Sequence, residues 1–386
     1  MTTPAPQPRP PAGTAAPRAA ARPARVFAPP GRVGILADRV LIHARPRGIT
    51  ALLPVIDARH SGLIVCGAKP ERAVSRCRDA GFAGIVAIDP AAYKEAATAE
   101  EPFTLSPDGQ LFEPSLEQVL DDQRAAGADV ALTPTRFFYP GERDALKAAA
   151  RIAASLNRDD TVFSVPLHIA WLNSTYVSQL IAVLQKVPLP KGIFLGSQLD
   201  PLDNVAEAAP NLRRLCREVR HLAVLRTDFA AFDVTAHGAF AASLGTGGSL
   251  RHIIRPDEKA FSPRPDDPSP TVLVPDLMHF YKGSTLATLY ANRSAPRCLC
   301  KVCHGRHIDT FIGADDRADA HLHSIQAWME WLPDHFDDPT VPGRAALWQA
   351  RCKAAVGNHD IYNTQLRVRN AFKPTNPLRI WAGDFE

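Results

Sequence analysis

The chain has 386 residues, of which 46% are apolar and 22% are charged, and its formal net charge is +4. This composition is ordinary for a soluble globular protein. No run approaches the roughly 18 consecutive apolar residues of a membrane span, so no membrane partner is expected. The small positive charge permits a polyanionic partner without demonstrating one.

Residues 1–31 differ in composition from the rest of the chain. They contain nine prolines, many alanines and several arginines, and no acidic residue precedes Asp38. Such a segment cannot bury a core, so we expect a disordered, solvated tail, with a nucleic-acid-binding arm as the alternative. It lacks the continuous apolar stretch of a signal peptide, and a cytoplasmic protein is expected.

From about residue 50, short apolar runs alternate with amphipathic stretches rich in alanine and leucine. The runs are near-continuous, which is typical of buried parallel strands. We expect strands at 51–57, 62–66, 84–89, 130–135, 162–168, 192–195, 221–226 and 239–244. We expect helices at 70–80, 115–126 (with Ser115 as N-cap), 142–156, 174–187, 211–220 and 229–236.

Eight strands with crossover helices predict an α/β fold, a (β/α)₈ TIM barrel, over residues 32–296. A doubly wound open sheet is the alternative. No Gly-x-Gly-x-x-Gly follows the first expected strand, which disfavours that alternative.

Chemistry in such barrels lies at the carboxyl ends of the strands. Two acidic candidates lie there, Asp89 after the third expected strand and Asp228 after the seventh. Either could instead be an ordinary turn or helix-cap aspartate. Further candidates for binding a substrate follow the sixth strand and the glycine-rich end of the eighth, where a phosphate site is common: Ser197, Gln198, Gly245, Gly247, Gly248, Arg251 and His252.

Three cysteines, Cys298, Cys300 and Cys303, fall within six residues. Thiolates this close cannot form unstrained disulfides with one another, but they can converge on one Zn²⁺ ion. The fourth ligand is expected from a histidine on the predicted helix downstream, His321 or His323. A closed set of four ligands predicts a structural site within a zinc-binding and helical region at 297–386, and reduced surface cysteines are the alternative. The other four cysteines are scattered, which fits a reducing cytoplasm.

A barrel that ends in Cys-x-Cys-x-x-Cys…His resembles the tRNA-guanine transglycosylase superfamily. The likeness spans roughly residues 50–330. The family's Asp-Ser-Gly-Gly-Tyr-Gln after the third strand is similar to Asp89-Pro90-Ala91-Ala92-Tyr93-Lys94. The similar order continues through Ser106–Gly109, Glu113–Glu117, Gly127–Val130 and Ala320–Ser324.

The resemblance implies exchange of a guanine base in tRNA or DNA for a 7-deazaguanine. It also implies a structural zinc with His323 as the fourth ligand, for which His359 is a weaker rival, and Asp89 as general acid or base. The partners implied are nucleic acid (DNA or tRNA), a guanine or 7-deazaguanine base, and either a second copy of the chain or a partner subunit.

The chain departs from the family at the second carboxylate, which should lie on the eighth strand. Ser243 stands in that place, and a serine hydroxyl is a weak nucleophile unless a base activates it. Asp228 is the expected substitute. The positions that should contact the base also differ, since Thr133 or Thr135 replaces an aspartate and Pro166 and Leu167 replace two glutamines. A non-catalytic partner subunit and an N-glycoside hydrolase therefore stay open as alternatives.

Overall fold

The computed structural model describes residues 27–106, 114–198, 200–261 and 266–384. Most of the predicted tail at 1–31 therefore lies outside the described residues, as does part of the 106–117 stretch that carries the family likeness.

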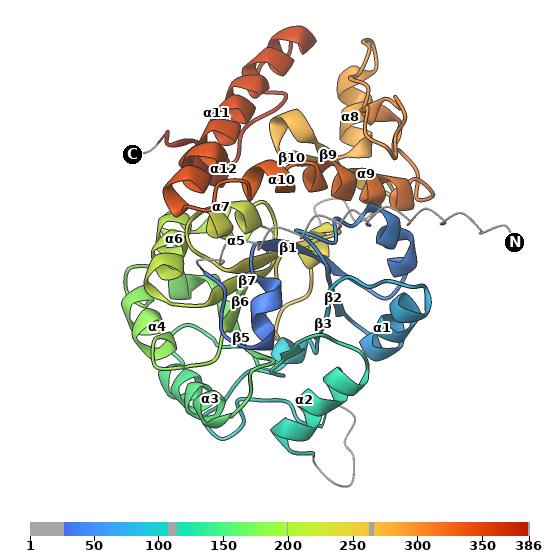
Figure 1. Cartoon of the computed structure of the whole chain (residues 1–386). Helices are drawn as coiled ribbons and strands as arrows, with labels where there is room; N and C mark the ends of the chain where they lie inside the picture. The colour runs from blue at the N-terminus through green and yellow to red at the C-terminus, as the bar shows by residue number, and fades with distance from the viewer. Residues whose placement is uncertain (1–26, 107–113, 199, 262–265, 385–386) are drawn as a thin grey trace, which may run out of the picture.

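The described residues form a nearly closed barrel of eight parallel strands (Figure 1). The strands pair in the order β3-β2-β1-β8-β7-β6-β5-β4, and a parallel bridge between Ala87 and Val130 brings β3 beside the start of β4. The predicted (β/α)₈ barrel is confirmed. The strands are β1 (Arg39–Ala44), β2 (Leu63–Cys66), β3 (Val86–Asp89), β4 (Ala131–Leu132), β5 (Thr161–His168), β6 (Lys191–Gly196), β7 (Leu222–Thr227) and β8 (Ala241–Gly245).

Helices connect successive strands and surround the barrel (Figure 1). They are α1 (Pro70–Asp79), α2 (Leu116–Ala125), α3 (Arg143–Ser155), α4 (Val177–Leu184), α5 (Pro201–Asn204), α6 (Ala208–Glu218) and α7 (Ala230–Ala236). Ser115 caps α2 as predicted. Its hydroxyl accepts a hydrogen bond from the backbone N–H of Gln118, whose side chain accepts one from the N–H of Ser115. This reciprocal pair satisfies two backbone donors that the first helical turn leaves free.

The prediction for the first strand was wrong. Residues Ile49–Val55 form a 3-10 helix that contains Pro54, and the strand that pairs with both β2 and β8 is Arg39–Ala44. Arg39 and His43 interrupt the apolar run of that strand, although every residue in it is buried. Their polar groups are satisfied inside the fold; for example, Arg39 donates hydrogen bonds to the carbonyls of Ala58 and Ser61. A polar residue with internal partners therefore hid a central strand from a pattern of apolar residues.

A second region follows the barrel and packs beside α7 and the 49–55 segment (Figure 1). Its helices α9 and α11 contact that segment and α7 respectively, on the side of the barrel where an eighth crossover helix would lie. The region contains the antiparallel pair β9 (Thr271–Val274) and β10 (His279–Lys282), then α8 (Gly283–Tyr290), α9 (Arg317–Met329), α10 (Leu332–His335), α11 (Val341–Leu366) and α12 (Asn376–Ala382).

Two apolar cores hold this region in place. Trp328 and Trp348 pack into the same core as the barrel helices, through Phe232 of α7. A separate core joins Val272 of β9 and Phe311 to Cys300 and Cys303. Residues of β9, α8 and the 308–311 segment therefore share their core with the cysteine loop, whereas Trp328 and Trp348 belong to the barrel core. No helix among the described residues is both long and apolar enough to cross a membrane.

We expect stability to fall in acid because of His335, which is buried at the junction of the two regions. Its Nε2 lies 2.8 Å from Thr235 Oγ1, and its ring meets Phe232 edge-on. Burial, with nearby cations, lowers the pKa of His335 to about 3, whereas an unfolded histidine titrates near 6.5. The unfolded state therefore binds the proton first, and the free energy of unfolding falls below pH 6.5, by about 1.4 kcal/mol per pH unit for this group.

Denaturant unfolding at pH 7, 6 and 5 measures this dependence. The His335→Gln variant should show a shallower loss of stability between pH 6 and 5. An identical slope in both proteins would remove His335 as the cause.

Candidate functional site

Asp89 lies at the carboxyl end of β3, in a hydrogen-bonded network inside the barrel. Its Oδ2 accepts from His43 Nε2 at 3.0 Å and from the Tyr93 hydroxyl at 2.7 Å, and its Oδ1 accepts from the Ala91 N–H at 2.8 Å. His43 comes from β1, and all three side chains that make this network are buried. Both oxygens of the carboxylate therefore have donors.

The contacts within this network determine the protonation states of Asp89 and His43. Burial alone would raise the pKa of Asp89, but the hydrogen bond from His43, the Arg226 charge and the Tyr93 hydroxyl lower it overall. Burial lowers the pKa of His43. An ionised Asp89 beside a neutral His43 satisfies every contact, because the Nε2–H of His43 then donates to the carboxylate. Its Nδ1 is left to accept from the Ser243 hydroxyl, 3.3 Å away.

Ser243, which stands where the family places its nucleophile, is fully buried on β8. Its hydroxyl oxygen also accepts a hydrogen bond from the backbone N–H of Arg226 at 2.7 Å. Ser243, His43 and Asp89 thus form one hydrogen-bonded chain across β8, β1 and β3. The hydroxyl lies beside a neutral imidazole, but it is enclosed by the barrel.

Arg226 ends β7 in a conformation that only a few non-glycine residues adopt, with φ at 55°. The pairing of β7 with β8 shifts register between Val224 and Thr227, as at a β-bulge. Such irregularities often redirect a side chain at a functional site. The guanidinium contacts the Tyr93 hydroxyl and lies 3.9 Å from Asp89 Oδ2. Its buried Nε has no hydrogen-bond partner among the described residues, so one donor is left unsatisfied by the protein.

Asp228 lies two residues beyond Arg226, in a second polar group. Its Oδ1 accepts from the Ala230 N–H at 2.8 Å, as a helix-capping aspartate does. Burial raises the pKa of Asp228, while Arg251 acts in the opposite direction. Burial and the charge of Asp228 raise the pKa of Asp200 to about 8. Burial therefore favours the protonated form of both carboxyls.

Arg251 lies in the loop after β8, as expected, and packs on an aromatic ring. Its guanidinium sits over the Phe280 ring, 3.1 Å from the ring centroid, and its charge interacts with Asp228 and Asp200. Burial lowers its pKa to about 9. Burial likewise lowers the pKa of the adjacent His252 to about 4, which leaves it neutral at pH 7. The guanidinium of the glycine loop is thus packed on an aromatic ring, and the charges of Asp228 and Asp200 act on it.

The glycine loop itself is held at the mouth of the barrel. The carbonyl of Ser249 accepts from Arg226 at 2.8 Å, and its hydroxyl accepts from Arg45 at 3.3 Å. A side chain at Gly245 would collide with the carbonyl of Leu250, whereas the space beside Gly248 is open. The loop therefore needs glycine for close packing at one position and presents a free surface at the other.

The two candidates after β6 differ in their availability. Gln198 is committed to the loop that follows the barrel, because its amide donates to Glu258 and Lys259 and accepts from the Phe261 N–H. Ser197 is half-buried, and its hydroxyl contacts only the Gln198 carbonyl among the described residues.

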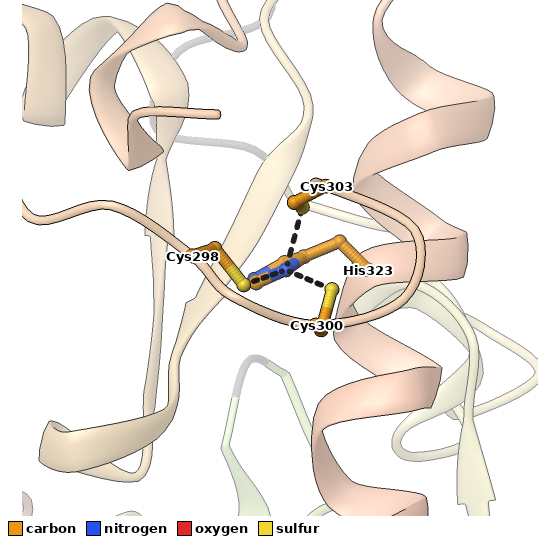
Figure 2. A group of neighbouring side chains, drawn as sticks. All are labelled: Cys298, Cys300, Cys303 and His323. Atoms are coloured by element: carbon orange, nitrogen blue, oxygen red, sulfur yellow. Dashed lines mark hydrogen bonds between the residues drawn. The ribbon is translucent and has the colours of Figure 1, made fainter. Parts of the chain in front are cut away.

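The three clustered cysteines converge on one histidine (Figure 2). The Nδ1 atom of His323 lies 3.2 Å from the sulfur of Cys298, 3.7 Å from that of Cys300 and 3.2 Å from that of Cys303. One ring nitrogen cannot donate to three sulfurs, so this arrangement is that of ligands around an ion. His323 Nε2 lies 2.8 Å from the Leu273 carbonyl, a contact that fixes the ring and frees Nδ1 for a metal. The cluster could bind a metal ion.

The structure selects His323 over both rival histidines. His359 hydrogen-bonds the Ala355 carbonyl four residues earlier, and His321 lies near Gly247 at the glycine loop. Within the cluster, hydrogen bonds with Cys298 lower the pKa of Cys300 and raise that of Cys303. Three sulfurs this close need a cation if all are to be thiolates.

Sequence reasoning missed His43, Arg226, Asp200 and Cys66. His43 directly follows the apolar run Val40-Leu41-Ile42, and that run was the signal in the sequence that could have revealed β1. Cys66 Sγ, His43 and Asp89 lie within 4.8 Å of one another. The neighbouring Arg226 charge opposes a cation there, and burial raises the pKa of the Cys66 thiol to about 12.

Comparison with known proteins identifies no relative, because neither the family models nor the curated proteins searched match this chain.

Proposed function

We propose that the protein is a transglycosylase-like enzyme that exchanges guanine in nucleic acid for a 7-deazaguanine. The observation that carries this proposal is the pair of strand-end carboxyls, Asp89 and Asp228, whose pKa values are displaced in opposite directions. Cleavage at a glycosidic carbon through an oxocarbenium-like state uses one ionised and one protonated carboxyl group. The barrel followed by a Cys₃His cluster, which resembles the transglycosylase superfamily, supports the same conclusion.

The environments of the two carboxyls suggest their roles. Asp89 is ionised and would stabilise positive charge at the sugar or take a proton, while Asp228 would give a proton to the departing base. This assignment moves the acid role, which the family likeness implies for Asp89, to Asp228. The Nε–H of Arg226, which has no partner in the described part of the chain, would hydrogen-bond an oxygen of the substrate, with the half-buried hydroxyl of Ser197 at the same end of the barrel.

The cation that we propose for the cysteine cluster is Zn²⁺. In a tetrahedron with Zn–S near 2.3 Å and Zn–N near 2.0 Å, a sulfur and a nitrogen lie about 3.5 Å apart. The observed separations of 3.2–3.7 Å bracket that value. Four protein ligands leave no open position, so the ion would stabilise the fold and take no part in the reaction. Thiolates that must stay reduced suit a cytoplasmic protein.

A second candidate function is a base-binding subunit that has no chemistry of its own. The specific observation in its favour is the enclosure of the network. Asp89 already has donors on both oxygens, and Ser243 is fully buried with its hydroxyl engaged at both ends. A substrate would have to displace Tyr93 or Arg226 to reach the carboxylate.

Incubation with radiolabelled guanine and separate pools of DNA and tRNA tests the proposal. We expect label to enter one of the pools, and we expect Asp228→Asn to lower the rate by about 10²-fold or more, because an amide cannot donate the proton. Asp79→Asn, an exposed aspartate at the end of α1, is the matched control and should exchange normally. Release of free guanine without exchange would indicate a hydrolase. Binding without either reaction would indicate the non-catalytic subunit.

A further inference from the structure

Five basic side chains lie on the loops that follow β1 and β2 and on α1. They are exposed, and none forms an ion pair with any described residue: Arg45, Arg47, Lys69, Arg72 and Arg76. Glu71 is the only acidic residue between positions 60 and 78. We call these five residues the basic rim. Their charge is neither neutralised by the fold nor needed for an internal ion pair.

The basic rim is one continuous surface. Arg76 donates to the Pro46 carbonyl at 3.2 Å, which ties α1 to the β1 loop. A side chain at Gly67 would touch Pro46 and Arg45, so the β1 and β2 loops lie against each other. Arg45 also donates to the Ser249 hydroxyl. The rim therefore runs without a break into the glycine loop after β8.

This surface borders the candidate site. The loops after β1, β2 and β8 and the end of β3 all lie at the carboxyl edge of the parallel barrel, where Asp89 stands. Arg226, Arg45 and Lys94 each act on the Cys66 thiol at the end of β2, in the direction that lowers its pKa. Positive charge thus approaches the buried network from both the β1 and β3 loops.

We propose that the basic rim, together with Ser249 and the open surface beside Gly248, binds the phosphodiester backbone of the nucleic acid whose base enters the barrel. The proposal rests on the proposed function and names the surface that holds its substrate. Unpaired arginines bind phosphate through two parallel N–H donors, and a hydroxyl adds a further donor. The phosphate nearest the site would lie against Arg45 beside Ser249, which are hydrogen-bonded to each other, and the strand would continue over Lys69 and Arg72. A nucleic acid is favoured over an acidic protein because the surface ends at strand-end carboxyls suited to glycosidic chemistry.

Fluorescence anisotropy of the full chain with labelled 20-base-pair DNA, single-stranded DNA and a tRNA transcript tests this surface. All three probes carry a phosphodiester backbone, and comparing them shows which kind of nucleic acid the surface prefers. In the Arg45→Gln/Arg72→Gln variant we expect the slope of log K against log salt to become shallower by about 1.4–1.8, since each lost phosphate contact removes about 0.7–0.9. Affinity at low salt should fall by about tenfold or more.

The matched control is Arg151→Gln/Arg220→Gln, which removes two exposed, unpaired arginines near the opposite end of the barrel. It should bind like the parent protein. Equal losses in both double variants, or no binding of any probe by the parent, would overturn the proposal. Normal binding through the basic rim without base exchange would support the binding surface and refute the proposed enzymatic activity. If the Arg45→Gln/Arg72→Gln variant exchanges bases at the parent rate, the binding surface is refuted and the proposed enzymatic activity is not.

Discussion

The Cys300→Ser protein is expected to purify without metal and to lose the fold of residues 271–311, which pack around the cysteine loop. Cys300 lies in the same core as Val272, Leu286 and Phe311, so the loop that holds the ion also closes that core. Apparent binding free energies of structural zinc reach about 10–16 kcal/mol, which matches the whole stability of an ordinary domain. Removal of one ligand, or of the ion by a chelator, should therefore unfold the region instead of only loosening it.

Elemental analysis gives the metal content, and hydrogen exchange locates the unfolded segment. The matched control is Cys77→Ala, which removes another buried cysteine, from α1, in the barrel core and not in this one. That variant should keep its metal and lose only the packing of one sulfur. Full metal content in Cys300→Ser, or the absence of zinc from the parent protein, would contradict the assignment.

The second large effect is expected from Asp89→Asn, which should lower the rate of base exchange by about 10²–10⁴-fold. The asparagine amide has a single acceptor oxygen, whereas the two oxygens of the carboxylate accept hydrogen bonds from His43, Tyr93 and Ala91. At least one donor is left facing the amide N–H, at a cost of about 1–3 kcal/mol. The variant should therefore stay folded but melt at a lower temperature.

The comparison variant is Tyr93→Phe, which keeps the carboxylate and removes one of its donors. It should fold normally and lose much less activity than Asp89→Asn. Exchange at the parent rate in Asp89→Asn would place the chemistry elsewhere. Complete unfolding of Asp89→Asn would instead mean that the carboxylate holds β1 and β3 together and has a structural role.

Several features of this protein could be predicted from local sequence. The spacing of Cys298, Cys300 and Cys303 allows three sulfurs to converge whatever the surrounding fold, because the backbone between them is short. The alternation of apolar runs and amphipathic stretches predicted the barrel, since parallel strands covered by helices are apolar throughout. Ser115 predicted the start of α2, because an N-cap depends only on residues within one helical turn.

Only the tertiary structure decided the partners that lie far apart in the chain. His321 and His323 face different directions because successive helical residues turn by about 100°, and the packing of α9 against β9 chose His323. The chain of hydrogen bonds from Ser243 through His43 to Asp89 depends on which strands are neighbours and on their register, and a shift of one residue would turn His43 to the other face. Arg251 was expected to bind phosphate, but β10 brings Phe280 beneath its guanidinium. These choices depend on contacts across the barrel that no local pattern contains.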